Sequence, residues 1–324
     1  MKALFDLFWT LCSLLAHLLS HWWFLQFTFQ KHWMDQFEAA GYPISKEKTK
    51  RIFHHYSYAS RLLVGSFLVF ESGQKLQKTE KWMLSEMGAI TALLDDLFDL
   101  SAISEKEVMD LLKEGKPIEG LEQESHWILL LEKAILHKVP NPELTLKWAS
   151  EVLKTQVASI AQKNATTYKQ QLKKISDDKG AASLLFYGSV RYGDRNERRE
   201  GVLRKYGIFL QFLNDLFDVY KDLQEGIRTH VNVASRIKPL QEEFLAHHRE
   251  LIQTMGGKRK LQAFLAFLAA RGLVAFRQYL ELEKKAQDQG FQAQSHSRRS
   301  LVVDMEKWSN LWQNMFEAWN FLRK

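Results

Sequence analysis

Cysteine is nearly absent from this chain, because Cys12 is the one cysteine among its 324 residues. A single cysteine forms neither an internal disulfide nor a metal site of the CxxC type, so both features are excluded. This usage is typical of a reducing compartment. We therefore expect a cytoplasmic protein.

Proline and glycine are also scarce, with five and sixteen residues respectively. That supply of turn residues is too small for an all-β fold, whereas Leu, Lys, Glu, Gln and Ala recur throughout. The sequence also lacks a repeat at solenoid spacing, a glycine-rich phosphate loop and a Pro/Ser-rich linker. We therefore expect an all-α protein, a single-domain bundle of ten or more mostly antiparallel helices.

The charge balance is basic, with a formal net charge of +7. An excess of this sign suits solubility, nucleic acid, anionic lipid or a phosphorylated substrate. Basic residues cluster at 191–205 and 295–299. No recognisable nucleic-acid-binding motif accompanies these clusters, so we expect no nucleic-acid partner.

One stretch near the N-terminus, Leu7–Phe29, contains no Lys, Arg, Asp or Glu. It is just long enough to span a bilayer, although several polar residues interrupt it. The stretch does not resemble a signal peptide, because Asp6 precedes it and no small-residue cleavage site follows. Three interpretations stay open: a transmembrane helix, a helix lying in the membrane interface with Trp9, Trp22 and Trp23 at the surface, and a helix packed on the protein itself.

The domain division follows from this N-terminal stretch. We predict an apolar helix within residues 1–35, packed or in peripheral membrane contact through residues 7–29. Residues 36–324 are predicted to form the main α-domain. A substrate with a hydrocarbon chain, delivered from a membrane, would favour the interfacial interpretation.

Helical periodicity continues through most of the remaining sequence. It predicts helices over 51–70, 81–100, 143 into the 160s, 181–193 and 197–225, with a loop or helix start at 176–180. Near the C-terminus, seven apolar residues recur at alternating steps of four and three, and we expect this helical stripe to pack. These residues are Leu301, Met305, Trp308, Trp312, Met315, Trp319 and Leu322.

Three aspartates stand in the otherwise apolar segment "ALLDDLFDL" (92–100). Asp95 and Asp99 are four residues apart, so they project from one face of a helix, and Asp96 lies beside them. A helix with this many apolar neighbours is expected to be buried. Like charges at this spacing destabilise a helix, and a desolvated carboxylate without a partner costs several kcal/mol.

A second acidic segment, "FLNDLFDVYKDL" (212–223), repeats the four letters DLFD. Asn214, Asp218 and Asp222 follow each other at steps of four, which again places three oxygen-bearing side chains on one helix face. Both acidic faces therefore call for cations. Oxygen ligands without Cys or His favour a hard ion such as Mg²⁺, which usually completes its shell with water and phosphate oxygens.

These segments resemble the two metal-binding motifs of class I terpene synthases, the isoprenoid-synthase fold. "DDLFD" (95–99) matches the aspartate-rich DDxxD motif as written. In the second motif, Asn214, Asp215 and Leu216 match directly. Asp218 replaces a Ser or Thr, and Asp222 replaces a Glu, so both positions keep an oxygen donor. The segment 212–223 is therefore a variant of the family motif.

The resemblance implies a bundle around a deep apolar pocket, with three Mg²⁺ ions at its mouth. It assigns the metal to Asp95, Asp96, Asp99, Asn214, Asp218 and Asp222, and all of these except Asp96 are also the catalytic residues that it implies. Lys221 stands where many members carry a lysine that contacts the diphosphate. The diphosphate-sensing arginine is missing at its usual distance, where Tyr168 stands, and Arg191 is the local candidate. Arg277 and Tyr279 loosely replace the usual Arg-Tyr pair.

The expected function is that of a Mg²⁺-dependent terpene synthase, a carbon-oxygen lyase that ionises a linear prenyl diphosphate and cyclises or quenches the allylic cation. Six aromatic residues are expected either to line the pocket or to pack in the core: Phe67, Phe70, Phe186, Tyr187, Phe209 and Phe212. One alternative is a prenyltransferase, although the Arg-Arg pair of chain-elongating enzymes is absent after the first motif. A second alternative is a membrane-associated helical protein without catalytic activity.

Overall fold

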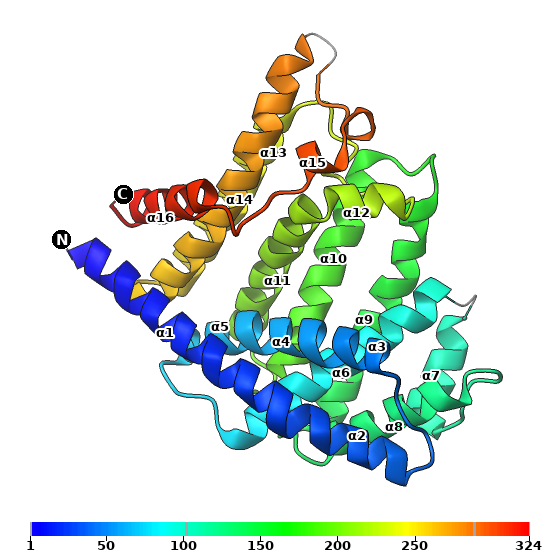
Figure 1. The fold of residues 1–324 in the computed structure, drawn as a ribbon. Coiled ribbons are helices and arrows are strands. Elements are labelled where there is room, and N and C mark those ends of the chain that lie inside the picture. The colour runs from blue at the N-terminus through cyan, green and yellow to red at the C-terminus, as the bar shows by residue number, and fades with distance from the viewer. Residues whose placement is uncertain (1, 101–102, 288–289, 324) are drawn as a thin grey trace. The chain divides into compact units, whose positions relative to one another are not determined.

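A computed structural model describes residues 2–100, 103–287 and 290–323 (Figure 1). These residues form helices joined by turns and loops, and no strand occurs among them. The prediction of an all-α protein is confirmed, and the helices of the described ranges exceed the ten that were predicted.

The chain divides into two compact units. The N-terminal unit consists of residues 11–157 and 183–196, and the C-terminal unit consists of residues 1–10, 158–182 and 197–324. The boundary predicted at residue 35 lies inside helix α2 (Gln30–Ala39). The division into an N-terminal helix and a main α-domain stays a prediction.

The N-terminal unit contains the first half of the helices. These are α1 (Lys2–Phe24, with its first residues in the other unit), α2, α3 (Lys46–Thr49), α4 (Ser57–Ala59), α5 (Ser66–Ser72), α6 (Lys78–Leu100), α7 (Glu105–Glu114), α8 (Glu122–Leu136) and most of α9 (Pro142–Ser159). Wider π-helical turns at Leu25–Phe29, Lys50–Tyr56 and Ser60–Gly65 join neighbouring α-helices, so the predicted helix over 51–70 is continuous but not regular.

Helix α6 lies at the centre of this unit, in contact with α4, α8 and the π-helical turns. At Gly88 the backbone of α6 lies close to that of Tyr56 and Ser57. A Cβ added to Gly88 would lie 2.7 Å from both Ser57 Cα and the Tyr56 carbonyl oxygen. Two serine hydroxyls reinforce the crossing, because Ser57 donates to the Ser85 carbonyl and Ser60 to the Leu84 carbonyl, each at 2.7 Å. This crossing fixes the segment that ends at Tyr56 against the acidic helix.

The C-terminal unit contains the remaining helices. These are α10 (Lys169–Gly188, with its last residues in the N-terminal unit), α11 (Glu197–Phe217), α12 (Val219–Gln224), α13 (Ile237–Met255), α14 (Arg259–Lys285), α15 (Arg298–Leu301) and α16 (Trp308–Arg323). Helix α11 contacts α13 and α14, and α14 contacts α16. Gly226 follows α12 with a φ of 68°, as expected for the residue that ends the predicted helix over 197–225.

Residues 176–180 are helical, contrary to the loop or helix start predicted there. Gly180 is the reason, because α10 crosses α11 at this residue and an added Cβ on Gly207 would lie 2.1 Å from the Gly180 carbonyl oxygen. Two glycines facing each other let the backbones touch, and the tertiary contact outweighs the weak helix propensity of "SDDKG".

The packing predicted for the C-terminal stripe is wrong for two of its tryptophans. Trp308 and Trp312 are 78% and 71% exposed. Helix α16 instead buries Asn314 and Ala318, whose small side chains let it approach α14 closely. The stripe also extends over two helices and the turn between them, because Leu301 ends α15. The spacing of apolar residues alone therefore does not show which face of a helix packs against a neighbouring helix.

Helix α1 both packs and exposes apolar side chains. Leu14 and His21 are buried, whereas Leu19, Trp22 and Trp23 are about half exposed or more. Within the described ranges, one helix, α14, is long and apolar enough to cross a membrane by length and composition. Because 67% of its most apolar window is buried, and core helices pass the same test, this finding is weak evidence for a membrane span.

Candidate functional site

The first acidic motif lies in the last turns of α6, within the N-terminal unit. Tyr56 donates its hydroxyl to Asp95 Oδ2 at 2.9 Å, and Arg51 contacts Asp96 Oδ1 at 2.7 Å. Asp95 is half-buried and Asp96 is 9% exposed. The chain's own donors therefore hold both carboxylates in place, one with a neutral hydroxyl and one with a cation.

A second tyrosine hydroxyl lies one helical turn before Asp95. Tyr187 donates to Thr91 Oγ1 at 3.1 Å, and Thr91 precedes Asp95 by four residues. Burial, followed by the charge of Asp95, raises the pKa of Tyr56. Burial is also the main cause that raises the pKa of Tyr187, so both hydroxyls stay protonated donors beside this carboxylate. The side chain of Asp99 lies outside the described part of the structure.

The second acidic motif connects α11 to α12 in the C-terminal unit. The helical dihedrals are interrupted at Asp218, but the i to i+4 hydrogen bonds continue through it. The Asp218 amide donates to the Asn214 carbonyl at 2.9 Å, and the Asp222 amide donates to the Asp218 carbonyl at 2.8 Å. The three side chains are therefore one turn apart, as predicted from their spacing.

The electrostatics of this cluster are unfavourable without an added cation. Burial, followed by the charges of Asp215 and Asp218, raises the pKa of Asp222 to about 8. Burial also raises the pKa of Asp218, while Lys221 and a hydrogen bond from the Asn214 amide oppose that rise. Asn214 Nδ2 donates to Asp218 Oδ2 at 3.1 Å, which leaves its own oxygen available for another interaction.

Asp215 belongs to the buried side of the same helix. It is 3% exposed and accepts hydrogen bonds from Ser176 Oγ and Gln211 Nε2, each at 2.7 Å. Burial raises its pKa to about 6 despite these bonds. His230 Nδ1 lies 3.8 Å from its carboxylate, but burial lowers the pKa of that imidazole to about 3, so the ring is neutral. Asp215 therefore anchors α11 to α10.

The structure adds residues to this site that the sequence analysis did not select. The guanidinium of Arg271 lies 5.7 Å from the ring centre of Phe217, and that of Arg298 lies 6.0 Å from the ring centre of Tyr220. Both arginines come from elements far along the chain, so no local spacing indicates them. Burial lowers the pKa of Arg271, as expected for a cation that lacks full solvation.

Tyr279, selected as half of a loose Arg-Tyr pair, lies next to the second motif. Its hydroxyl donates to the carbonyls of Leu216 at 2.9 Å and Leu301 at 3.0 Å. Burial, with Asp218 and Asp222 as further causes, raises its pKa. Tyr279 thus connects α14 to the turn that precedes Asp218. Arg277 is exposed and within 3.9 Å of Glu281 on its own helix.

Arg191 is engaged within the N-terminal unit. Its guanidinium forms hydrogen bonds of 2.6 Å and 3.0 Å to Glu80, and it also donates to the Leu68 carbonyl and to the Ser72 hydroxyl. Its predicted contact with a diphosphate stays a prediction. Lys221, the other predicted diphosphate ligand, is exposed on α12 and lowers the pKa of both Asp218 and Asp222.

The oxygen donors of the second motif fit a hard divalent cation. Asn214, Asp218 and Asp222 offer an amide oxygen and two carboxyl groups whose pKa values are raised chiefly by burial. Among the residues described with side chains, no group of three or more His, Cys, Asp or Glu is arranged to hold a metal ion. That description leaves out the amide of Asn214 and the side chain of Asp99. Magnesium binding stays a prediction.

The six aromatic residues expected at a pocket are all buried. Phe209 stacks on Phe244 at 5.1 Å, and Phe212 contacts the same ring edge-on at 5.4 Å, so these two pack in an aromatic cluster of the C-terminal unit. Their role as pocket lining stays a prediction, as does the convergence of the two acidic motifs, which belong to different units.

No protein-family model, curated protein or solved structure matches this chain. The likeness to terpene synthases therefore rests on the residues of the two motifs and on the all-α architecture.

Proposed function

We propose that this protein is a Mg²⁺-dependent class I terpene synthase, which ionises a linear prenyl diphosphate and cyclises or quenches the resulting allylic cation. The observation that carries the proposal is the cluster of Asn214, Asp218 and Asp222, in which burial raises the pKa of both aspartates although Lys221 opposes the rise. Placing these acidic side chains in an apolar helix costs free energy of folding, and a bound cation would offset that cost. The DDxxD segment on α6 supports the same chemistry.

The ligands proposed for the metal are the six residues of the two motifs: Asp95, Asp96, Asp99, Asn214, Asp218 and Asp222. When bound, Mg²⁺ acts as a Lewis acid that neutralises negative charge on the departing diphosphate. The chain's own contribution is to present carboxyl and amide oxygens from α6, α11 and α12. Tyr56 holds Asp95 through its hydroxyl, and Asn214 orients Asp218 through its amide.

Three cations of the C-terminal unit support recognition of the diphosphate. Lys221 lies on α12 between two acidic ligands, and Arg271 and Arg298 lie beside the aromatic rings at either side of Asp218. Guanidinium groups bind phosphate oxygens in a bidentate manner and stay charged at neutral pH. The resemblance to terpene synthases implies an arginine that contacts the diphosphate, with Arg191 as the candidate in the sequence. We assign that contact to Arg271 and Arg298 instead.

The proposal includes the finer fold, a class I isoprenoid-synthase bundle around a deep apolar pocket. An aromatic lining would exclude water and offer ring faces to the cation that forms after ionisation. Phe209 and Phe212 come from the same helix as Asn214 and are the lining candidates nearest to it in the sequence.

The experiment is an assay of purified protein with Mg²⁺ against prenyl diphosphates from C10 to C35, with diphosphate release and products measured. Replacing one metal ligand of a cluster lowers such rates by about a hundredfold or more. We expect this loss for Asp222→Asn, and little change for Glu225→Gln, an exposed carboxylate three residues further on. Equal turnover of wild type and Asp222→Asn would remove Asp222 from the site.

The same assay separates the alternative enzyme. A prenyltransferase would form product only when isopentenyl diphosphate is added with the allylic substrate, whereas a synthase needs no second substrate. Absence of diphosphate release under all these conditions would favour the helical protein without catalytic activity.

A further inference from the structure

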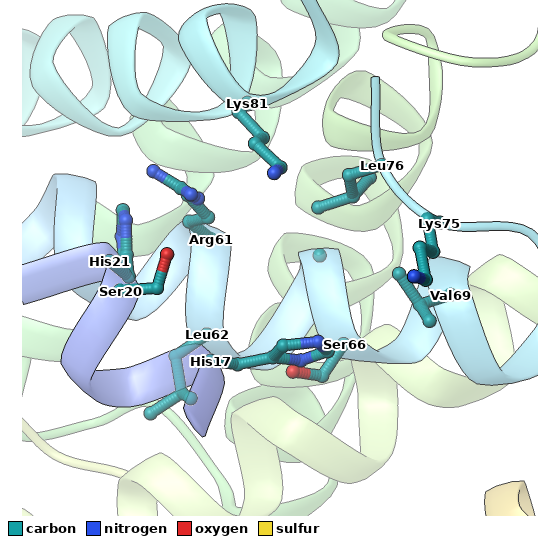
Figure 2. A pocket seen from close by; sticks show the side chains of 11 residues that line it. His17, Ser20, His21, Arg61, Leu62, Ser66, Val69, Lys75, Leu76 and Lys81 are labelled. Atoms are coloured by element: carbon teal, nitrogen blue, oxygen red, sulfur yellow. The ribbon is translucent and has the colours of Figure 1, made fainter. Parts of the chain in front are cut away.

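A pocket of about 560 Å³, counted out to the surrounding solvent, lies in the N-terminal unit away from the acidic motif. Helix α1, the π-helical turn before α5, helix α5, the loop after it and the start of α6 form its walls (Figure 2). Its polar lining consists of His17, Ser20, Arg61, Ser66, Lys75 and Lys81, with His21 beside them, and no carboxylate lines it. Three cations therefore share one cavity.

Arg61 is the buried member of this group. The residue is 8% exposed, and its Nη1 atom is buried without a hydrogen-bond partner. Its guanidinium lies 4.7 Å from the ring centre of Phe24, a contact that supplies no hydrogen-bond acceptor for Nη1. Burial lowers the pKa of Arg61 to about 10. A buried cation with an unused donor is costly, and an anion in the pocket would supply the missing interactions.

The two lysines increase the positive potential of the same cavity. Figure 2 shows Lys81 extending downward from the top of the view, with Arg61 to its left and Lys75 to its right. Burial, followed by the charges of Arg61 and Lys75, lowers the pKa of Lys81. Burial, followed by the charges of these three cations, lowers the pKa of His17, so its ring is neutral near pH 7.

Carboxylates on the neighbouring elements are engaged elsewhere. Glu80, just before Lys81, is held by Arg191, and Glu71 at the end of α5 accepts a hydrogen bond of 2.9 Å from the Tyr192 hydroxyl. Neither residue lines the pocket. The positive charge of the cavity is therefore not neutralised from within.

We propose that this pocket binds a phosphate group, as a phosphate monoester or diphosphate. Arg61, Lys75 and Lys81 supply charge, and the hydroxyls of Ser20 and Ser66 supply further donors. Three cations and two hydroxyls match the charge and the several oxygens of a phosphate better than those of a single carboxylate.

The proposed phosphate site is separate from the acidic motif on the same helix. Lys81 precedes Asp95 by fourteen residues, which corresponds to about 21 Å along α6. Phosphate binding here needs no metal, because the cations belong to the chain. This independence allows the site to be tested apart from the proposed enzymatic activity.

The phosphate could belong to a soluble compound or to a lipid headgroup. Helix α1 contributes His17 and Ser20 to the pocket and exposes Leu19, Trp22 and Trp23 to solvent. Exposed tryptophan and leucine on a helix are typical of contact with a membrane interface. The experiment therefore compares both sources.

The test measures binding of inorganic diphosphate by isothermal titration calorimetry in buffer with EDTA and without Mg²⁺. We expect wild type to bind, and the variant Lys75→Ala/Lys81→Ala to bind at least about tenfold more weakly, because each removes a charged donor. The matched control is Lys78→Ala/Lys113→Ala, which removes two exposed lysines outside the pocket and should leave affinity unchanged. Arg61→Gln, checked by circular dichroism for folding, should also weaken binding.

A parallel arm measures cosedimentation with vesicles of phosphatidylcholine alone or mixed with phosphatidic acid. Binding to the mixed vesicles that Lys75→Ala/Lys81→Ala weakens and the control does not indicates a lipid phosphate, and binding of inorganic diphosphate indicates a soluble one. Either result supports the site. The proposal is overturned if wild type binds neither probe, or if both double variants lose binding equally. Because Mg²⁺ is absent, a negative result here leaves the proposed synthase activity intact.

Discussion

At the residue scale, Asp222 shows how burial and neighbouring charge act together. The side chain is 8% exposed, and Asp215 and Asp218 both add negative charge near it. Its pKa of about 8 means that the metal-free fold holds a proton on this carboxyl at neutral pH. The unfolded chain releases the same proton near pH 4, so folding and proton binding are linked.

This linkage predicts a pH-dependent stability. A raised folded-state pKa contributes stability that is present below about pH 4 and lost as pH rises through about 8. Without divalent metal, the melting temperature of wild type should therefore fall between pH 5 and pH 8, by roughly several degrees. Asp222→Asn carries no charge and should flatten this fall, as measured by differential scanning calorimetry.

The control for this prediction is Glu242→Gln, an exposed carboxylate on α13 that should leave the pH dependence unchanged. Asp215, with a pKa of about 6, changes stability with pH in the same direction in wild type and in all variants. The effect of Asp222 is therefore the difference between the plots of melting temperature against pH. Curves of identical slope for wild type and Asp222→Asn would contradict the electrostatic account of the cluster.

At the scale of the elements, one backbone contact sets the position of the second motif. The facing glycines Gly180 and Gly207 let α10 touch α11, and this contact brings Ser176 to Asp215. The segment "SDDKG" is predicted as a loop or helix start from its composition alone, because propensity does not include the tertiary contact. The segment is helical because the close contact between Gly180 and Gly207 stabilises it.

We expect Gly207→Ala to destabilise the fold by about 1–3 kcal/mol, because the new Cβ has no space beside the Gly180 carbonyl. Gly201 is the matched control on the same helix, since an added Cβ there meets nothing within 4 Å. Gly201→Ala should stabilise by up to about 1 kcal/mol through helix propensity. Urea unfolding of the two variants measures the difference, and equal effects would show that the crossing is not tight.

At the scale of the whole molecule, each compact unit carries one acidic motif. The proposed chemistry needs both motifs, because the family pattern distributes the metal ligands over two helices. Residues that act as one catalytic unit give strongly non-additive losses when they are replaced together. The two motifs are therefore tested best in combination.

We expect Asp95→Asn and Asn214→Ala each to lower turnover of the best prenyl diphosphate by about a hundredfold or more. The double variant should lose little beyond either single variant. Single-turnover rates measure this, with far-ultraviolet circular dichroism to show retained helix content. Losses that multiply in the double variant would mean that the two motifs work independently.

The predicted membrane contact through residues 7–29 also concerns the whole molecule. Trp22 and Trp23, near the end of α1, are 48% and 61% exposed. Trp22→Ser/Trp23→Ser should weaken cosedimentation with phosphatidylcholine vesicles by at least about tenfold, because two large apolar surfaces are removed. Trp308→Ser removes a tryptophan that is 78% exposed on α16 and serves as the control. Equal losses would place the contact elsewhere.

The sequence by itself determined the all-α class, most helix positions and the stacking of Asn214, Asp218 and Asp222. Each of these depends on local spacing, because helical hydrogen bonds join residues four apart and fix which side chains share a face.

Only the tertiary structure decided which side chains meet these residues from distant elements. Tyr56 at Asp95 and Arg271 beside Phe217 are examples, as is the gathering of Arg61 and Lys81 in one pocket. The exposure of Trp312 was decided in the same way, because the face that meets α14 is set by small residues on the other side of α16. Contacts between segments far apart in the sequence depend on packing, which no local period encodes.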